Sequence, residues 1–261
     1  MDWVKSFYSK TGKWWGPAEV KITDRDYKRL ETVKRLNGSL PQSVLELGAS
    51  YGNTAAVMAE AGIDVTAVEI SDRADFAKEY TKNEYKGKLK FVKDDFYKVI
   101  LNQKFDVVCY WNGFGIGSDN EQKTLLKRIA DEWLKADGSL IMDVQNPIVW
   151  ERWNGDREDK KASPEKGYLF NVSQSIKYDP IEKRMYDTWW ETENPENKFV
   201  QTIRCYIPSE LNILVKDTGL VIVRMEVDGK PLDWHESIPP GHPYYDHHEY
   251  LVQLKINQNG Q

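Results

Sequence analysis

The stretch Val44-Leu45-Glu46-Leu47-Gly48-Ala49-Ser50-Tyr51-Gly52 decides the fold. Its opening apolar residues predict a short buried strand, which runs into a glycine-containing turn at the start of a helix. Gly48 and Gly52 let a ligand approach the backbone closely, because glycine has no side chain. The spacing, Glu-x-Gly-x-x-x-Gly, differs from the Gly-x-Gly-x-x-Gly of dinucleotide-binding loops. Since an acidic group before the first glycine would repel a pyrophosphate, Glu46 is better suited to holding a cationic amine.

Strands and helices alternate on the carboxyl-terminal side of this stretch. Short apolar strands are predicted at residues 65–68, 89–92, 105–109 and 139–144. Amphipathic segments between them predict helices, the strongest of which carries Leu125, Leu126, Ile129, Trp133 and Leu134. This alternation predicts an α/β fold with a doubly wound, mostly parallel sheet. A ligand is then expected at the carboxyl-terminal edge of the strands.

Acidic residues follow two of these strands. Glu69 stands at the tip of the second strand, where its carboxylate is placed to accept both hydroxyls of a ribose. Asp95, followed by Phe96, stands at the end of the third strand and can accept a hydrogen bond from the exocyclic amine of adenine. Because the carboxyl ends of parallel strands share one edge, these groups and the glycine turn are expected to lie together.

The segments before and after the predicted α/β core have different sequence patterns from the core. Residues 1–38 are rich in aromatic side chains and end in a helix that starts at a capping box of Thr23 and Asp26, so they are predicted to form an N-terminal helical lid. Residues 150–207 alternate apolar and polar positions, which predicts an antiparallel β insertion that forms a cap. A helix after Ser209 and strands at residues 220–227 and 249–256 are predicted to complete a seven-stranded sheet as an antiparallel pair. Residues 39–149 and 208–261 are therefore taken as one domain.

Over roughly residues 40–146 the chain resembles the class I S-adenosylmethionine-dependent methyltransferases, in its motifs and in their order. The resemblance implies that Glu46 and the Gly48–Gly52 loop line the methionine moiety, that Glu69 binds the ribose, and that Asp94-Asp95-Phe96 meets the adenine. The family usually has a third glycine where Ala49 or Ser50 stands. The predicted residues of the S-adenosylmethionine site are Tyr8, Trp15, Glu46, Gly48, Ala49, Gly52, Glu69, Ile70, Asp94, Asp95, Phe96 and Trp111. The domain of residues 39–149 and 208–261 is then the catalytic domain, and the insertion resembles the cap sheet of the small-molecule N-methyltransferase branch, which includes sugar-amine enzymes.

By the same resemblance, Tyr110-Trp111-Asn112 follows the fourth strand beside the transferring methyl group. Methyl transfer from a sulfonium is an in-line displacement, in which the protein mainly aligns the reactants and excludes water. A neutral amine needs little further help, whereas a hydroxyl usually needs a base. Nucleic-acid methyltransferases that target the amino groups of bases carry Asn-Pro-Pro-Tyr after the fourth strand; this chain has Tyr110-Trp111-Asn112-Gly113 there. The predicted catalytic residues are His235, Tyr110 and Trp111.

Tryptophans gather where a pocket lid is expected, and their rings can hold a cationic or planar substrate at about 0.5–2 kcal/mol each. Core packing is the other interpretation for any one of them. The predicted substrate-binding residues are Trp14, Trp111, Asn112, Trp150, Trp189 and His242. The histidines of the carboxyl-terminal region, His235 and His242 among them, lack the helical spacing of known zinc sites, so no metal is predicted. A histidine can instead serve as a general base.

Composition bounds the remaining classes. The 261 residues carry a net charge of −5, with 40% hydrophobic and 30% charged residues, as an ordinary soluble globular protein does. The slightly acidic balance argues against a nucleic-acid partner, and no apolar stretch is long enough to span a membrane. No signal peptide is recognised at the N-terminus, and the presence of only 2 cysteines points to a reducing compartment, so a cytoplasmic location is predicted.

The function predicted from sequence is methyl transfer from S-adenosylmethionine to a small molecule or short peptide-like metabolite, with nitrogen as the favoured acceptor atom. An O-methyltransferase that uses a histidine or carboxylate base is the first alternative. A non-catalytic S-adenosylmethionine-binding protein is the second, and a nicotinamide enzyme is disfavoured by the glycine spacing. The chain is expected to be a monomer or a homodimer.

Overall fold

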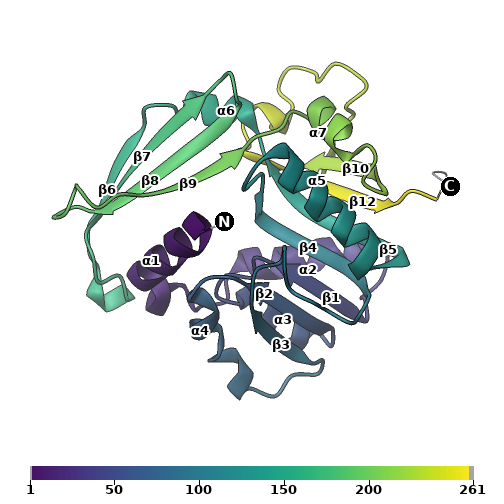
Figure 1. Ribbon diagram of the computed structural model, residues 1–261, viewed down its shortest axis with the longest axis horizontal. Helices are drawn as coiled ribbons and strands as arrows, with labels where there is room; N and C mark the ends of the chain where they lie inside the picture. Colours follow the sequence, from purple (N-terminus) through teal and green to yellow (C-terminus); the bar gives the residue numbers. More distant parts are fainter. Residues whose placement is uncertain (1, 259–261) are drawn as a thin grey trace. The chain divides into compact units, whose positions relative to one another are not determined.

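A computed structural model describes residues 2–258 of the protein and divides them into two compact units (Figure 1). The first unit is formed by the residues up to Ile100 together with Gly155–Ile176 and Tyr186–Gln201. The second unit is formed by Leu101–Asn154, Lys177–Met185 and the residues from Thr202 onward. Because the chain passes between the units repeatedly, neither unit is one continuous segment.

A parallel sheet forms the base of the first unit. Strands β1 (Ser43–Leu47), β2 (Asp64–Glu69) and β3 (Leu89–Lys93) pair in that order, so Leu47 lies opposite Val68 and Glu69 opposite Lys93. All residues of β1 are buried, as expected for a parallel strand that is covered on both faces. The strands predicted at residues 44–47, 65–68 and 89–92 are confirmed. The carboxyl ends of these strands form one edge.

Helices α2 (Asp24–Asn37) and α3 (Asn53–Glu60) belong to the same unit. The capping box predicted at Thr23 and Asp26 is confirmed, and α2 ends at Gly38, whose φ is +81°. The helical segment between β2 and β3 is short: α4 (Arg73–Ala77) is followed by the 3-10 turn η1 (Tyr80–Lys82).

The N-terminal aromatic segment is one amphipathic helix, α1 (Asp2–Glu19). Its buried side chains, Val4, Phe7, Thr11 and Trp14, recur every three or four residues and so lie on one face. Gly12, Gly16 and Pro17 lie within this helix, although glycine and proline weaken a helical pattern. One of those glycines has a packing reason, because a Cβ at Gly16 would collide with the ring of Phe76 on α4.

An antiparallel sheet has the strand order β6-β7-β8-β9. The bounds are β6 (Arg157–Lys160), β7 (Val172–Asp179), β8 (Arg184–Glu191) and β9 (Phe199–Arg204), with a 3-10 turn η3 (Pro164–Lys166) before β7. The predicted antiparallel strands are confirmed as β7, β8 and β9. β6 was not predicted, because its four residues are all charged and exposed. Figure 1 shows α1 lying beside the part of this sheet that belongs to the first unit.

The second unit holds strands β4 (Phe105–Phe114), β5 (Leu134–Gln145), β12 (Glu249–Ile256), β10 (Leu220–Val227) and β11 (Lys230–Pro231), paired in that order. β4 and β5 are parallel, and the pairs β5–β12 and β12–β10 are antiparallel. The predicted antiparallel closing pair is therefore confirmed. The helices of this unit are α5 (Asp119–Arg128), the π-helical turn η2 (Ile129–Trp133), α6 (Pro147–Arg152), α7 (Pro208–Val215) and the 3-10 turn η4 (Pro243–Tyr245).

Two boundaries in the second unit differ from the sequence-based prediction. Leu134, predicted to be helical, begins β5, since the π-helical turn ends the helix one residue earlier. β4 was predicted to end at Cys109 but continues to Phe114. The pairing register of β4 with β5 shifts between Tyr110 and Phe114, so the added residues form an irregular end to the strand.

Candidate active site

The loop between β1 and α3 has a left-handed backbone at alternate residues. The φ angle is +64° at Gly48, +52° at Ser50 and +80° at Gly52. The glycines adopt this conformation readily, whereas a residue with a side chain, such as Ser50, pays about 1–2 kcal/mol for it. Gly52 is required for a second reason, because a Cβ there would lie 2.5 Å from the ring of Phe91. Ser50 therefore occupies the backbone conformation for which a third glycine was expected.

Glu69, at the end of β2, is buried and ties this loop to the sheet edge. Its Oε2 accepts the backbone N–H of Ser50 at 2.9 Å, and its Oε1 accepts the N–H of Ser71 at 2.8 Å. A carboxylate has about four acceptor positions, so each oxygen retains one. Glu69 can accept two further hydroxyl groups while it holds the loop in place.

Glu46, in β1, is a buried carboxyl group that lacks a full set of partners. Its Oε2 has no hydrogen-bond partner among residues 2–258. Burial raises the pKa of Glu46 to about 8, and the nearby Arg29 guanidinium only partly opposes this shift. A buried acceptor without a donor is unfavourable by about 1–3 kcal/mol. A ligand that brings a hydrogen-bond donor or a positive charge would satisfy this oxygen.

The predicted adenine residues follow β3 at the same edge. The N–H of Asp94 donates to the carbonyl of Glu69, so the turn after β3 is attached directly to the end of β2. Asp94 is exposed, whereas Asp95 and Phe96 are half-buried. The Asp95 carboxylate accepts the N–H of Tyr97 at 2.9 Å. Ile70, also half-buried, follows Glu69 directly, and the structure brings all of these residues to one edge as predicted.

Arg73, on α4, is a residue of this edge that sequence reasoning missed. Its guanidinium lies between the rings of Tyr8 and Tyr51, 4.9 and 5.0 Å from their centroids. It donates to the Ser50 hydroxyl at 3.2 Å, to the Thr11 hydroxyl at 2.8 Å and to the Tyr8 carbonyl at 3.2 Å. Arg73 thus joins the glycine loop to helix α1. No local motif marks it, because its partners come from distant segments.

The predicted aromatic residues of the first unit do come together. We define the α1 cluster as the packed group Trp3, Phe7, Tyr8, Trp14, Trp15, Val172, Trp189 and Phe199. Trp15 packs edge-on against Trp189, with ring centroids 4.9 Å apart, and remains half-buried. Trp14 is buried and its indole N–H donates to Glu191 at 2.8 Å. The Trp189 indole N–H donates to Asp187 at 2.8 Å. Trp14 therefore serves packing, while Trp15 has ring surface left to offer.

Comparison with known proteins identifies the glycine loop and its strands. Residues 44–138 match the family described as methyltransferase domain. Residues 44–138 thus form a class I S-adenosylmethionine-dependent methyltransferase domain. A curated relative, a cypemycin N-terminal methyltransferase from Streptomyces sp, is 31% identical over 116 residues, which is 44% of this chain and 46% of the relative. This methyltransferase chain thus matches less than half the length of that relative.

Solved structures resemble the methyltransferase over nearly its whole length. An S-adenosylmethionine-dependent methyltransferase from Clostridium acetobutylicum ATCC 824 has a TM-score of 0.70 at 14% identity, covering 96% of this chain and 99% of its own. The sugar N-methyltransferase KedS8 from Streptoalloteichus sp ATCC 53650 has a TM-score of 0.59 at 14% identity, covering 89% and 87%. At such low identity these likenesses show the fold alone. They confirm the predicted class, a Rossmann-like α/β sheet with a separate antiparallel sheet.

The cofactor of this methyltransferase family, S-adenosylmethionine, fits the hydrogen-bond acceptors that the first unit offers. Its methionine moiety carries an ammonium group, which can donate a hydrogen bond to the unpartnered Oε2 of the buried Glu46. Its ribose carries two neighbouring hydroxyls, and each oxygen of Glu69 has an acceptor position left. The fit rests on the chemistry of these carboxyl groups.

Predicted catalytic residues of the second unit lie at the irregular end of β4. Asn112 is exposed, has a φ of +54° and donates its backbone N–H to the Asp143 carboxylate at 2.5 Å. Trp111 is buried, and the buried Tyr110 hydroxyl donates to the carbonyl of Gly113 at 2.7 Å. Asp143 holds Asn112 in its left-handed conformation, a role that sequence reasoning missed. The catalytic and binding roles of residues 110–112 stay predictions.

The other predicted residues of the second unit have local partners. The buried Trp150 donates its indole N–H to Gln145 at 2.8 Å. Tyr244 donates its N–H to Nδ1 of His242 at 3.1 Å, and Nε2 of His242 lies 3.3 Å from the Pro231 carbonyl, so this ring fastens its own loop. His235 is exposed beside Trp234. A solvated imidazole on a loop gives the predicted base role no geometric support.

Among residues 2–258, no group of three or more His, Cys, Asp or Glu side chains is arranged to hold a metal ion. Within the same range, no helix is long and apolar enough to cross a membrane. The prediction of no metal and the prediction of a monomer or homodimer stay predictions.

Proposed function

We propose that the protein transfers a methyl group from S-adenosylmethionine to a nitrogen atom of a small molecule or short peptide-like metabolite. The observation that carries the cofactor half of this proposal is the buried, unpartnered Oε2 of Glu46 at the edge that also presents Glu69. Glu46 would pair with the ammonium group of the methionine moiety, and Glu69 would accept the ribose hydroxyls. The turn at Asp95 and Phe96 would receive the adenine.

Bound S-adenosylmethionine supplies a methyl group on a positively charged sulfonium, so that the amine lone pair forms the new N–C bond, the sulfur keeps the electron pair of the broken S–C bond, and the nitrogen then releases a proton. The residues of the first unit align the reactants and exclude water from them. No chemistry is required of a protein base when the acceptor nitrogen is already neutral.

The tyrosines beside the glycine loop support nitrogen over oxygen as the acceptor. An alcohol acceptor needs a base near neutral pH, and a tyrosine acts as one only when its pKa falls. Burial raises the pKa of Tyr51 to about 12, against an opposing effect of Arg73. Burial likewise raises the pKa of Tyr8 far above its ordinary value. Similarity to the cypemycin N-terminal methyltransferase and to the sugar N-methyltransferase KedS8 points to nitrogen as well.

Isothermal titration with S-adenosylhomocysteine, the product of the cofactor, tests the cofactor half. Glu69→Ala removes both loop anchors and the ribose acceptors, so the affinity should fall about tenfold or more. Glu60→Ala, at an exposed glutamate that ends α3, is the matched control and should bind as the wild type does. Wild-type affinity in Glu69→Ala would exclude the ribose role.

Release of S-adenosylhomocysteine from a panel of amines and alcohols tests the acceptor half. Turnover with amines only is the expected result. Turnover with alcohols only would make the protein an O-methyltransferase. Tight cofactor binding without turnover of any compound would favour a non-catalytic S-adenosylmethionine-binding protein.

A further inference from the structure

Another buried carboxylate, Asp187 on β8, lies beside the α1 cluster and takes no part in the cofactor site. It is 5% exposed. Its Oδ1 accepts an N–H from Gln174 at 2.8 Å, and its Oδ2 accepts from Trp189 at 2.8 Å and Gln201 at 2.7 Å. These donors are neutral amides and an indole. They satisfy hydrogen bonds, but none of them balances a negative charge.

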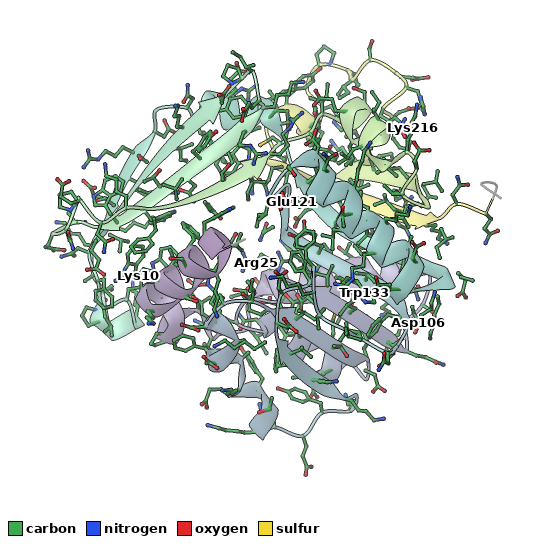
Figure 2. All side chains as sticks on the ribbon, in the orientation of Figure 1. Lys10, Arg25, Asp106, Glu121, Trp133 and Lys216 are labelled. Carbon is green, nitrogen blue, oxygen red and sulfur yellow. The ribbon has the colours of Figure 1, made fainter. Side chains whose placement is uncertain are left out.

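Glu191, on the same strand, is a carboxylate with only a structural role, and its partners can be compared with those of Asp187. Two positions further on from Trp189, Glu191 accepts the Trp14 indole N–H and pairs with the Lys10 ammonium at 2.7 Å (Lys10 is labelled in Figure 2). Asp187 is more deeply buried, yet no lysine or arginine forms an ion pair with it among residues 2–258. The cation near its neighbour Trp189 is Lys160, which lies 4.8 Å from the ring centroid and pairs with Glu158.

A buried negative charge without a counter-ion is strongly unfavourable, and a buried charge in a protein is normally paired. Among residues 2–258 no lysine or arginine is paired with Asp187, whereas aromatic rings, which attract cations, lie beside it. The indole of Trp189 is bonded to the carboxylate, and the half-buried Trp15 packs on Trp189. A carboxylate beside aromatic faces is the combination that binds an ammonium group.

We propose that Asp187, together with Trp15 and Trp189, forms a subsite for an ammonium group of the methyl acceptor, separate from the nitrogen that is methylated. The two nitrogens must differ, because an ammonium held by a carboxylate has no lone pair with which to attack. The acceptor is then a compound with a second, protonated amine. This assignment rests on the proposed function and names the substrate class of that same site.

A continuous chain of contacts joins this subsite to the cofactor loop within the first unit. Gln201 donates to Asp187 and accepts the Tyr8 hydroxyl at 2.9 Å. The carbonyl of Tyr8 accepts from Arg73, which in turn donates to the Ser50 hydroxyl of the glycine loop. Tyr8 of helix α1 thus links the ammonium subsite to the cofactor loop. A ligand that bridges the two would be held in register by α1.

Phenethylamine and 2-phenylethanol are suitable probes, because they share a ring for the α1 cluster and differ in the charge of the terminal group. Each is titrated against the protein saturated with S-adenosylhomocysteine, with tryptophan fluorescence as the readout. The wild type should bind the amine about tenfold or more tighter than the alcohol. Asp187→Asn, which keeps the shape and removes the charge, should retain at most the roughly threefold preference that the rings contribute. Glu191→Gln, the matched control, should keep the preference for the amine.

Separate measurements keep the outcomes apart. Equal binding of the two probes by the wild type, or a preference that is undiminished in Asp187→Asn, would overturn the ammonium subsite. If Asp187→Asn does not fold, Trp15→Leu replaces it: the preference should fall about threefold, and an unchanged preference would overturn the subsite. Titration of S-adenosylhomocysteine alone tests the proposed function. If S-adenosylhomocysteine does not bind, the two probes are titrated without it, and their relative affinities then test the ammonium subsite alone.

Discussion

The cofactor edge and the α1 cluster lie in the same unit but are built in opposite ways. The cofactor edge takes Glu46, the loop of residues 48–52 and Glu69 from one strand-turn-helix-strand segment. The α1 cluster takes side chains from residues as distant as Trp3 and Phe199. A ligand that is common to a whole family can be recognised by a local motif. The acceptor-binding role proposed for the α1 cluster would depend instead on side chains that only the tertiary fold brings together.

The two regions also differ in what holds them in shape. The cofactor loop depends on backbone geometry, with left-handed residues at Gly48, Ser50 and Gly52 and a backbone anchor at Glu69. The α1 cluster depends on packed rings, such as Trp15 against Trp189. Backbone conformations tolerate few substitutions, whereas packed aromatic surfaces tolerate conservative ones. Substitutions at the cofactor edge should therefore have the larger effects.

The largest effect is expected for Gly52→Ala. The new Cβ would sit in a left-handed backbone and meet the Phe91 ring at 2.5 Å. Gly38→Ala is the matched control, since Gly38 has nearly the same φ, +81°, with nothing within 4 Å of its Cβ position. Both variants bear the conformational strain of about 1–2 kcal/mol. Only Gly52→Ala adds a clash, which should lower the free energy of unfolding by about 1–3 kcal/mol more.

Urea denaturation and titration of S-adenosylhomocysteine check this pair. Gly52→Ala should also weaken cofactor binding about tenfold or more, while Gly38→Ala binds normally. Equal stability of the two variants would mean that the Phe91 ring moves aside without cost, and the loop would then be held less rigidly than its geometry indicates.

The second effect concerns the pH dependence of stability at Glu46. Burial raises the pKa of Glu46 from its ordinary 4.5 to about 8, so the folded state holds a proton that the unfolded state releases. The resulting stability is complete below pH 4.5 and is lost as the pH rises through 8. Glu46→Gln cannot ionise, so its stability should not fall in this window. The wild type should lose up to about 1.4 kcal/mol per pH unit relative to the variant.

Calorimetry of cofactor binding extends the same test. If the ammonium group of S-adenosylhomocysteine pairs with an ionised Glu46, binding at neutral pH releases the proton of that carboxyl group. The binding enthalpy of the wild type should then vary with the ionisation enthalpy of the buffer, and that of Glu46→Gln should not. Buffer-independent binding by the wild type would show that Glu46 does not meet the ammonium group.

The cofactor edge could be predicted from sequence because its signals are local. The strand before Gly48, the turn and the acid at residue 69 form a pattern with fixed spacing, and parallel pairing then places their ends together. The capping box at Thr23 and Asp26 was predictable for the same reason. Even Ser50 was visible as a departure, although only the structure shows its φ of +52°.

The remaining parts of the site could not be predicted, because their meaning depends on distant partners. In the sequence, Arg73 is an ordinary charged residue at the start of a helix. Only the structure shows that its guanidinium lies against the rings of Tyr8 and Tyr51. Asp187 reads as a polar position in an alternating strand until Gln174 and Gln201 are seen to donate to it. Tyr110 to Asn112 were placed after β4 because a bulged strand end resembles a loop in sequence.

The smallest effect is expected at the ion pair that borders the α1 cluster. Lys10 and Glu191 are each about one-third exposed, so their pair should contribute about 0–1 kcal/mol to stability. Lys10→Met keeps an unbranched stem against the rings of Trp14 and Phe199, and Glu191 still accepts the Trp14 indole N–H. The Lys10 ammonium lowers the pKa of Glu191, so the contribution of the pair is present at neutral pH and lost as the pH falls through that lowered pKa.

Urea denaturation of Lys10→Met and of the surface control Lys78→Met should give equally small losses at neutral pH, with cofactor affinity unchanged. A loss well above about 1 kcal/mol in Lys10→Met alone would show that charge as well as packing holds α1 on the sheet.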